Sequence, residues 1–209
     1  MRNQTKQDAV YTGSLPEQLA QHKLGTTERA RAFYQKQWVD QLNEEMKGFI
    51  QRQEMVFIAT ADEHGKPDCS LRAGKAGFVH VLDSRRLGYP EYRGNGVMAS
   101  VGNILNNPNI GMIFVDFFQS TVGLHVNGKA QVLENHELAQ LPNVSPVMPK
   151  EVMIKGGGRQ SVCWVLVEVE EAYIHCSKHI PLLAKLDKQL HWGTDDERFK
   201  GGDFFQVKS

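Results

Sequence analysis

A glycine-rich stretch in the middle of the chain carries the clearest chemical pattern. The segment 93–96 (RGNG) places a cationic and an amide side chain among two glycines, and Ser100 follows four residues later. From Val97 to Leu105, apolar side chains recur at helical spacing, so a helix is expected to begin here. The first amides of a helix lack intrahelical partners, and its dipole is positive at that end. Such a terminus suits a phosphate, but a capped helix after a glycine loop would show the same residues.

A second polar pair precedes this stretch. Ser70 and Arg72 alternate along 67–73 (PDCSLRA), which is expected to be a strand returning from the apolar strand 55–61. A guanidinium can hold a phosphate through two parallel hydrogen bonds, so Arg72 is a candidate anion ligand. Two structural alternatives stay open: Arg72 is a surface arginine of an edge strand, and Ser70 is an ordinary strand residue.

Histidine and cysteine side chains gather near the end of the last predicted strand, at His175, Cys176 and His179, with Lys178 between them. A metal site needs a third or fourth ligand with fixed geometry, and the change from strand to loop at Cys176 separates these side chains. No metal site is therefore predicted. His125 lies on the strand face opposite the apolar residues, which favours a solvent-facing or hydrogen-bonded histidine over a proton donor beside a cofactor ring.

The first quarter of the chain reads as helical. Gly25 is expected to end one helix, and Asn43 is expected to cap another that runs to about Gln53. Between them, a helix is expected to carry aromatic and apolar residues on its core face, including Trp38 and Leu42.

The remainder reads as mainly β, which gives an α+β fold overall. Apolar and alternating runs predict strands at 55–61, 67–73, 78–82, 86–89, 110–118, 121–134 and 162–176. Asn127-Gly128 interrupts one of these strands and is expected to be a bulge. About six strands around one inserted helix favour a closed or split antiparallel barrel. The missing β-α-β alternation excludes a dinucleotide-binding fold.

Composition narrows the classes of partner. The chain has 24 basic and 24 acidic side chains and a pI near 7.1, so bulk charge indicates neither a nucleic-acid nor a membrane partner. No run is apolar enough to span a bilayer, and the first ten residues lack the apolar core of a signal peptide. Three scattered cysteines do not form a disulfide framework, which favours a cytoplasmic location.

The expected organisation is a loose N-terminal tail over residues 1–14 and a single domain over 15–209. Within that domain, 15–53 form a helical lead-in, 54–178 form the barrel, and 179–209 form a C-terminal extension.

Three motifs in order resemble a known family. FIATADEHGKPDCSLR, YRGNGVMASVGNILNNPNIGMIF and GLHVNGKAQVL are similar to the FMN-binding split-barrel superfamily that is named for pyridoxamine 5'-phosphate oxidase. The similarity runs from about Phe49 to Leu133, and the tail "strand, helix, NNP, strand, VxGxA" is its most specific part. DCSLRAGKAGFVHVLD, YPEYRGNGVMASVGN and EAYIHCSKHIP resemble an uncharacterised subfamily, and with the N-terminal helices that likeness covers most of the chain.

This resemblance implies a six-stranded antiparallel split barrel that forms a homodimer and binds FMN at the subunit interface. It places the flavin phosphate beside the strand 69–72 and beside the loop and helix start 92–100. By resemblance, the candidate cofactor-binding residues are Ser70, Arg72, Arg93, Asn95, Ser100 and Lys178.

The expected function is that of an FMN-dependent oxidoreductase that acts on an unknown small molecule and uses no protein nucleophile. Pyridoxamine 5'-phosphate oxidation itself is disfavoured, because the family's residues for the substrate phosphate have no counterpart in 141–161 or in the C-terminal FFQVKS. Two alternatives stay open. One is a deazaflavin in place of FMN, and the other is a non-catalytic protein that binds flavin, deazaflavin or haem.

Overall fold

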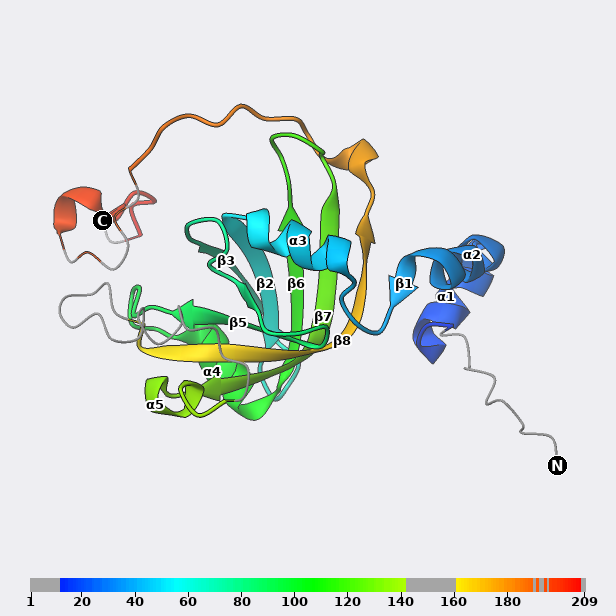
Figure 1. Cartoon of the computed structure of the whole chain (residues 1–209), viewed down its shortest axis with the longest axis horizontal. Coiled ribbons are helices and arrows are strands. Elements are labelled where there is room, and N and C mark those ends of the chain that lie inside the picture. Colours follow the sequence, from blue (N-terminus) through cyan, green and yellow to red (C-terminus); the bar gives the residue numbers. More distant parts are fainter. Residues whose placement is uncertain (1–11, 142–160, 190, 192–193, 195, 208–209) are drawn as a thin grey trace.

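A computed structural model of the chain describes residues 12–141, 161–189, 191, 194 and 196–207, and one antiparallel sheet dominates them. Figure 1 shows this sheet curling into a half-barrel. The strand order is β3-β2-β6-β7-β8-β5-β4, and β1 pairs with β8 beside this path. The strands are β1 (Trp38–Val39), β2 (Met55–Ala61), β3 (Pro67–Ala73), β4 (His80–Val81), β5 (Arg86–Glu91), β6 (Asn109–Val115), β7 (Gly123–Leu133) and β8 (Cys163–His175). The helices are α1 (Leu15–Leu24), α2 (Thr27–Gln37), α3 (Glu44–Arg52), α4 (Ala99–Asn106), α5 (Asn135–Leu138) and the 3-10 turns η1 (Ser177–His179) and η2 (Glu197–Phe199).

The predicted fold class is confirmed, with a different strand count. The described residues form eight strands rather than six, because β1 and β4 add two strands of two residues each. β4 keeps only His80–Val81 of the predicted strand 78–82, since only these residues pair with β5. β5 continues beyond the predicted end at Tyr89 because it stays paired with β8 as far as Glu91.

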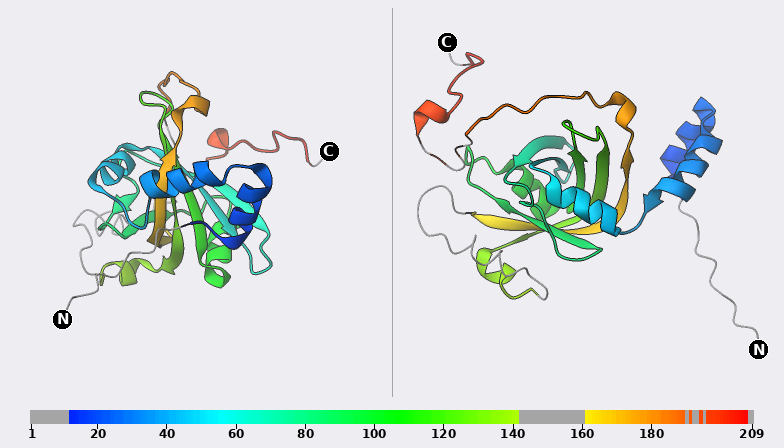
Figure 2. Two further views of the ribbon diagram at one scale, coloured as in Figure 1. Left: turned by 90° about the vertical axis from the view of Figure 1, so that its right-hand side faces the viewer. Right: turned by 45° about the horizontal axis from the view of Figure 1, so that its top comes forward.

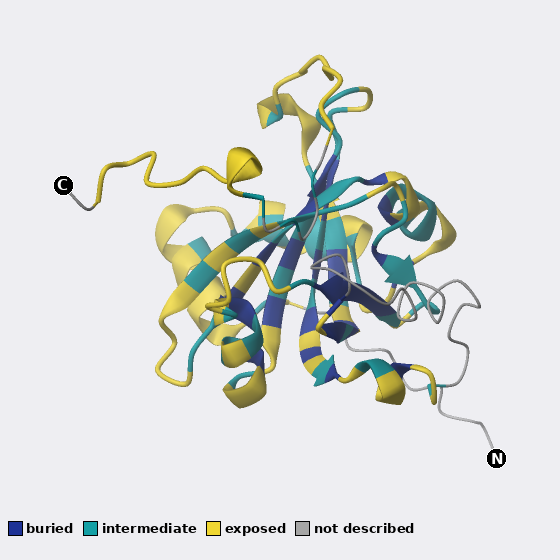
Figure 3. Ribbon diagram, turned by 90° about the vertical axis from the view of Figure 1, so that its left-hand side faces the viewer, coloured by how far each residue is buried: buried dark blue, intermediate teal, exposed yellow. Residues whose placement is uncertain are grey.

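Alternating side chains of the long strands fill the barrel. The core includes Ile50 of α3, Val56 and Ile58 of β2, Tyr89 of β5 and Phe114 of β6. Burying an apolar side chain of this size contributes about 1.5–3 kcal/mol. Figure 3 shows the buried residues concentrated in the strands, whereas exposed residues dominate the C-terminal segment. The barrel therefore supplies the rigid frame on which any site is built.

The predicted bulge is confirmed, and a glycine permits it. The register between β7 and β8 shifts between Asn127 and Gly128. A Cβ atom on Gly128 would lie 1.9 Å from the carbonyl oxygen of Glu168, so any larger residue would push the two strands apart. The bulge lets the long strand β7 bend around the barrel.

The N-terminal helices pack unequally. Gly25 ends α1 with a left-handed conformation, and the Asn43 side chain caps α3 by accepting the Met46 N–H, as predicted for both residues. α3 places Ile50 in the barrel core. In contrast, α1 and α2 have no buried residue, and Figure 2 shows them standing beside the barrel.

The helix that was expected to carry Trp38 and Leu42 ends before both. α2 ends at Gln37, and Trp38 pairs with Tyr173 in the short strand β1. The Trp38 indole donates to Glu171 Oε2 at 2.9 Å, while Leu42 is buried in the connection to α3. Cross-strand partners override helical spacing here, since aromatic residues fit a pleated surface well.

The predicted tail falls mostly on residues 1–11, which lie outside the described residues. Ser14, the last residue assigned to that tail, caps α1 through a reciprocal capping box with Glu17. Within the described residues, no helix combines the length and apolarity needed to cross a membrane.

Candidate functional site

The half-barrel is open between β3 and the end of β5. Within the described part of the chain, β3 pairs only with β2, and β4 pairs with β5 only at Leu87 and Gly88. A pocket of about 610 Å³, which we call the seam pocket, lies at this opening. The seam pocket is lined by Asp68, residues 70–73, Phe78, residues 90–95 and residues 97–101.

Arg72 crosses the seam. Its Nε atom donates to Oε1 of Glu91 at 2.8 Å, and its Nη2 atom forms an ion-pair contact with the same oxygen, also at 2.8 Å. Its Nη1 atom donates to Ser70 Oγ at 2.7 Å and to the Leu71 carbonyl oxygen at 3.2 Å. A guanidinium has five N–H groups, so these three hydrogen bonds leave about two of them, on the Nη2 atom that lies against Glu91. The Arg72 and Glu91 side chains are only 20% and 5% exposed, so water screens this ion pair weakly.

Burial disfavours the ionised forms of two acidic side chains at this end of the barrel. Burial raises the pKa of Glu91, and the hydrogen bond and charge of Arg72 offset only part of that rise. Tyr89 lies two residues earlier in β5, and its buried hydroxyl has no hydrogen-bond partner among the described residues. Burial also raises the pKa of Tyr89. Electrostatic interactions in such surroundings are stronger than in water.

The loop before α4 adopts conformations that favour glycine. Gly94 and Gly96 have φ values of 51° and 81°, and the Gly96 N–H donates to the Arg93 carbonyl oxygen at 2.8 Å. The Asn95 Oδ1 atom accepts the backbone N–H two residues further on at 3.0 Å. Asn95 therefore shapes the loop, and its side-chain NH₂ group retains donors for a ligand.

The helix predicted from Val97 begins two residues later, at Ala99. Met98 precedes it with φ 55°, a left-handed conformation that costs about 1–2 kcal/mol for a residue other than glycine. Val97 and Leu105, two of the apolar residues whose spacing predicted this helix, are 72% and 70% exposed. The helix instead buries Ser100 and Ile104. Its first residues line the seam pocket, so their amides, which lack intrahelical partners, belong to the site.

Side-chain hydrogen bonds tie α4 to the sheet. Ser100 Oγ donates to Asp68 Oδ2 at 3.1 Å, and the Asn103 amide donates to Thr60 Oγ1 at 3.0 Å. Ser100 is buried, so it connects β3 and α4 at the floor of the seam pocket.

The structure brings five of the six predicted cofactor-binding residues into one pocket, and these are Ser70, Arg72, Arg93, Asn95 and Ser100. Lys178 is exposed on η1 and does not line it. Sequence reasoning missed Asp68 and Glu91. Asp68 was detectable, because polar residues at 68, 70 and 72 share one face of a strand by alternation. Glu91 was missed because its strand was predicted to end at Tyr89, two residues before it.

The histidines form a separate cluster. His125 lies on the outer face of β7, and its Nε2 atom is 3.0 Å from Nδ1 of His175. Its ring stacks on Tyr173, with centroids 4.7 Å apart. Burial lowers the pKa of His125, and the charge of His175 lowers it further. Neither histidine lines the seam pocket. Among the described residues, no group of three or more His, Cys, Asp or Glu side chains is arranged to hold a metal ion.

The seam pocket fits FMN in size and in the kinds of surface it offers. Its volume lies within the range of roughly 300–1,000 Å³ that is usual for ligand sites. Arg93, Asn95 and the first amides of α4 suit a phosphate, and Phe78 and Met98 offer apolar surface to a ring. The carboxylates of Asp68 and Glu91 offset the two arginines, so a phosphate would meet a lining with no net formal charge.

Several solved structures are similar to this chain. HupZ from Group A Streptococcus is 22% identical, with 62% of this chain and 90% of that chain covered and a TM-score of 0.45. A putative pyridoxamine 5'-phosphate oxidase from Lactobacillus delbrueckii is 23% identical, with 65% and 95% covered and a TM-score of 0.47. HutZ, described as a haem storage protein of Vibrio cholerae, is 15% identical, with 64% and 93% covered and a TM-score of 0.41.

No curated protein matches the chain. The sequence profile of one family, pyridoxamine 5'-phosphate oxidase, matches residues 42–176. This range is about two thirds of the chain and includes every strand from β2 to β8, together with the seam pocket. The chain therefore belongs to the pyridoxamine 5'-phosphate oxidase family.

Proposed function

We propose that this chain is an FMN-binding flavoprotein and an oxidoreductase that acts on a small molecule. The observation that supports this most is the seam pocket itself. Two segments distant in sequence, β3 and the loop before α4, bring arginines, small polar side chains and helix amides to one opening. The free backbone N–H groups and the dipole at the start of a helix favour a bound phosphate by themselves.

Each part of the pocket has a definite task in this proposal. Arg93 and the first amides of α4 hold the phosphate, and Ser70 and Asn95 bind the ribityl chain. Phe78 and Met98 pack against the ring and exclude water from one side of it. Bound FMN supplies the hydride and electron transfer, while the chain supplies binding, orientation and local electrostatics.

The proposal includes a homodimer with the cofactor at the subunit interface, because Arg93 and Asn95 are exposed at the rim. Lys178 lies outside the pocket of its own chain, so it would reach the cofactor only from the second subunit. A cytoplasmic location is part of the proposal, and the three unpaired cysteines support it. We do not propose pyridoxamine 5'-phosphate as the substrate, because the sequence offers no counterpart to the family's grip on its phosphate.

A titration with FMN and with riboflavin tests this proposal. Flavin fluorescence should be quenched with a lower Kd for FMN, because riboflavin lacks the phosphate. Anaerobic addition of NADH or NADPH, followed by air, then distinguishes an oxidoreductase from a protein that binds flavin without turnover. A protein that binds neither flavin would overturn the proposal, and the same titration with a deazaflavin or with haem would then test the two remaining alternatives.

A further inference from the structure

Glu91 stands out because it faces the proposed phosphate site without being needed to bind it. Its carboxylate lines the seam pocket and is 5% exposed, and one of its oxygens accepts a hydrogen bond from Arg72 Nε and lies 2.8 Å from Arg72 Nη2. An arginine that opens onto a phosphate site would be expected to present its paired N–H groups to the ligand. Here the Nε and Nη2 side of the guanidinium lies against the protein's own carboxylate.

The hydrogen bonds across the seam do not by themselves require a charged residue at position 91. A glutamine there has a carbonyl oxygen at a similar place and can accept hydrogen bonds from Arg72. A glutamine would also avoid placing a negative charge near a bound phosphate. The negative charge of Glu91 therefore has an effect on anions that is separable from closing the seam.

That charge acts in a place where electrostatic effects are large. The pair is mostly shielded from solvent, and the second carboxylate of the pocket, Asp68, is already engaged by Ser100. With Glu91 ionised, the Arg72–Glu91 pair as a whole contributes no net charge to the lining. Arg93 and the helix amides must then hold the phosphate. With the charge of Glu91 removed, the same arginine becomes an uncompensated cation beside the ligand.

We propose that Glu91 determines the anion affinity of the seam pocket, because it holds Arg72 across the seam and withholds that charge from the bound phosphate. This inference rests on the proposed function in so far as the phosphate is that of FMN. Glu91 is thus a positioning residue that keeps the cofactor exchangeable, rather than a ligand of the cofactor.

The first test is Glu91→Gln, with Kd measured for FMN and for riboflavin. FMN should bind about tenfold more tightly than to the wild type, which corresponds to roughly 1.4 kcal/mol. Riboflavin should bind equally well to both, because it has no phosphate to sense the change. Glu54→Gln is the matched control, since Glu54 pairs with an exposed lysine outside the seam pocket. Equal or weaker FMN binding by folded Glu91→Gln would overturn the inference.

A second pair of variants keeps the inference testable if Glu91→Gln does not fold. Arg72→Gln leaves the charge of Glu91 unbalanced and should weaken FMN binding more than about tenfold. The double variant Arg72→Gln with Glu91→Gln restores the neutral balance of the wild type and should bind FMN within about threefold of it. Equal weakening in the single and double variants would show that the charge of Glu91 has no effect.

Failure of the proposed function gives a different result. If neither the wild type nor Glu91→Gln binds FMN, the proposed function is wrong, and thermal unfolding with inorganic phosphate decides the inference alone. A larger phosphate-induced rise in Tm for Glu91→Gln than for the wild type supports it. An equal rise, or no rise in either protein, contradicts it.

Discussion

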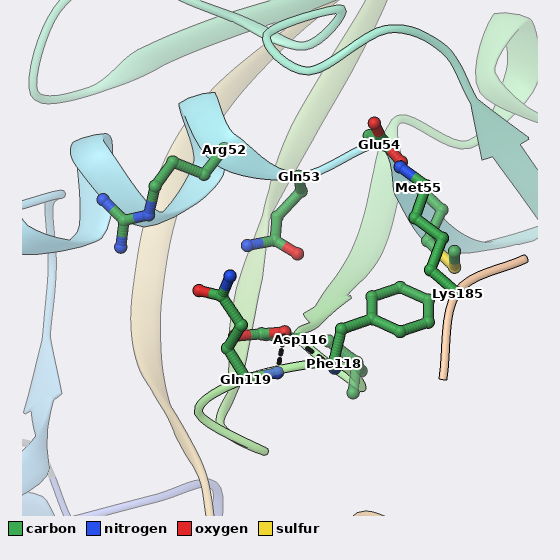
Figure 4. Close-up of a pocket in the computed structure, with 9 residues that line it drawn as sticks. Arg52, Gln53, Glu54, Met55, Asp116, Phe118, Gln119 and Lys185 are labelled. Carbon is green, nitrogen blue, oxygen red and sulfur yellow. Dashed lines mark hydrogen bonds and ion pairs between the residues drawn. The ribbon is translucent and has the colours of Figure 1, made fainter. Parts of the chain in front are cut away.

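Two pockets of this molecule hold similar residues but differ in how those residues are used. The first is the seam pocket. The second is a smaller pocket of about 330 Å³ at the end of α3, and we call it the α3 pocket. It is lined by residues 52–55, Val115, Asp116, Phe118, Gln119 and Lys185. Figure 4 shows Gln53 and Gln119 pointing toward each other there. Both pockets contain an ion pair and a further acidic residue that accepts at least one hydrogen bond.

In the α3 pocket, Asp116 finds its hydrogen-bond partners within its own loop. Asp116 accepts hydrogen bonds from the backbone N–H groups of residues 118, 119 and 120 and from the Ser120 hydroxyl. The Lys185–Glu54 pair is 58% and 41% exposed. In the seam pocket, by contrast, the Arg72–Glu91 pair is mostly shielded from solvent. The low exposure of its ion pair therefore distinguishes the seam pocket from the α3 pocket.

The largest expected effect is on stability, and it comes from removing the cation of each ion pair. Arg72→Ala leaves the buried carboxylate of Glu91 without its ion-pair partner, which should lower the free energy of unfolding by about 3–5 kcal/mol. Lys185→Ala removes an exposed pair and should cost about 1 kcal/mol or less. Denaturant unfolding of the two variants measures the contrast. Similar losses in both would show that burial of the seam pair adds nothing.

The next largest effect is on FMN binding, and it comes from replacing an arginine that belongs to neither of these two ion pairs. If Arg93 holds the phosphate, Arg93→Ala should weaken FMN binding by about 2 kcal/mol, which is close to thirtyfold. Arg52→Ala, at the α3 pocket, is the matched control and should change the Kd less than about twofold. Fluorescence titration gives both values. A control that weakens binding as much as Arg93→Ala would show that the flavin does not bind in the seam pocket alone.

A pH experiment tests the α3 pocket separately. Partial burial would raise the pKa of Asp116, but the hydrogen bonds of its own loop outweigh it and lower the pKa to about 2 from the ordinary 3.8. The stabilisation from this lowered pKa is therefore fully present above the ordinary value and is lost as the pH falls toward the lowered one. Asp116→Asn should cost about 1–2 kcal/mol at neutral pH and progressively less in acid, with FMN binding unchanged. A cost that does not depend on pH would contradict this role.

The smallest expected effect is that of a neutral side chain. Asn95→Ala removes the acceptor that shapes the loop before α4, so FMN binding should weaken by about 1 kcal/mol, roughly fivefold. Gln119→Ala at the α3 pocket should leave the Kd unchanged. If Asn95→Ala weakens binding more than Arg93→Ala does, the loop conformation matters more than the cation.

Residues that cap a helix or permit a bulge were predicted more reliably than residues assigned from helical periodicity alone. Gly25, Asn43 and Gly128 were placed correctly because a cap, a turn or a bulge depends on nearby backbone geometry. Trp38 was misplaced because it pairs with Tyr173 in a strand, and Val97 was misplaced because the helix begins two residues after it, beyond the left-handed Met98. These misplacements concern side-chain surroundings, which a periodic pattern does not encode.

The candidate site shows the same division. The sequence located both segments of the seam pocket, and the structure brings five of their predicted residues together. It did not reveal the pairing of Arg72 with Glu91, because that contact depends on how the half-barrel closes across residues 19 positions apart. Lys178 was suggested by resemblance alone, and its role requires a second subunit.

The most direct test of the seam pocket as a flavin site is an absorbance spectrum of wild-type protein, Arg93→Ala and Arg52→Ala after incubation with FMN and desalting. Wild type and Arg52→Ala should retain the flavin bands at nearly equal intensity, and Arg93→Ala should lose most of them. If all three proteins emerge colourless, or if all three retain FMN equally, Arg93 does not hold a flavin phosphate in the seam pocket.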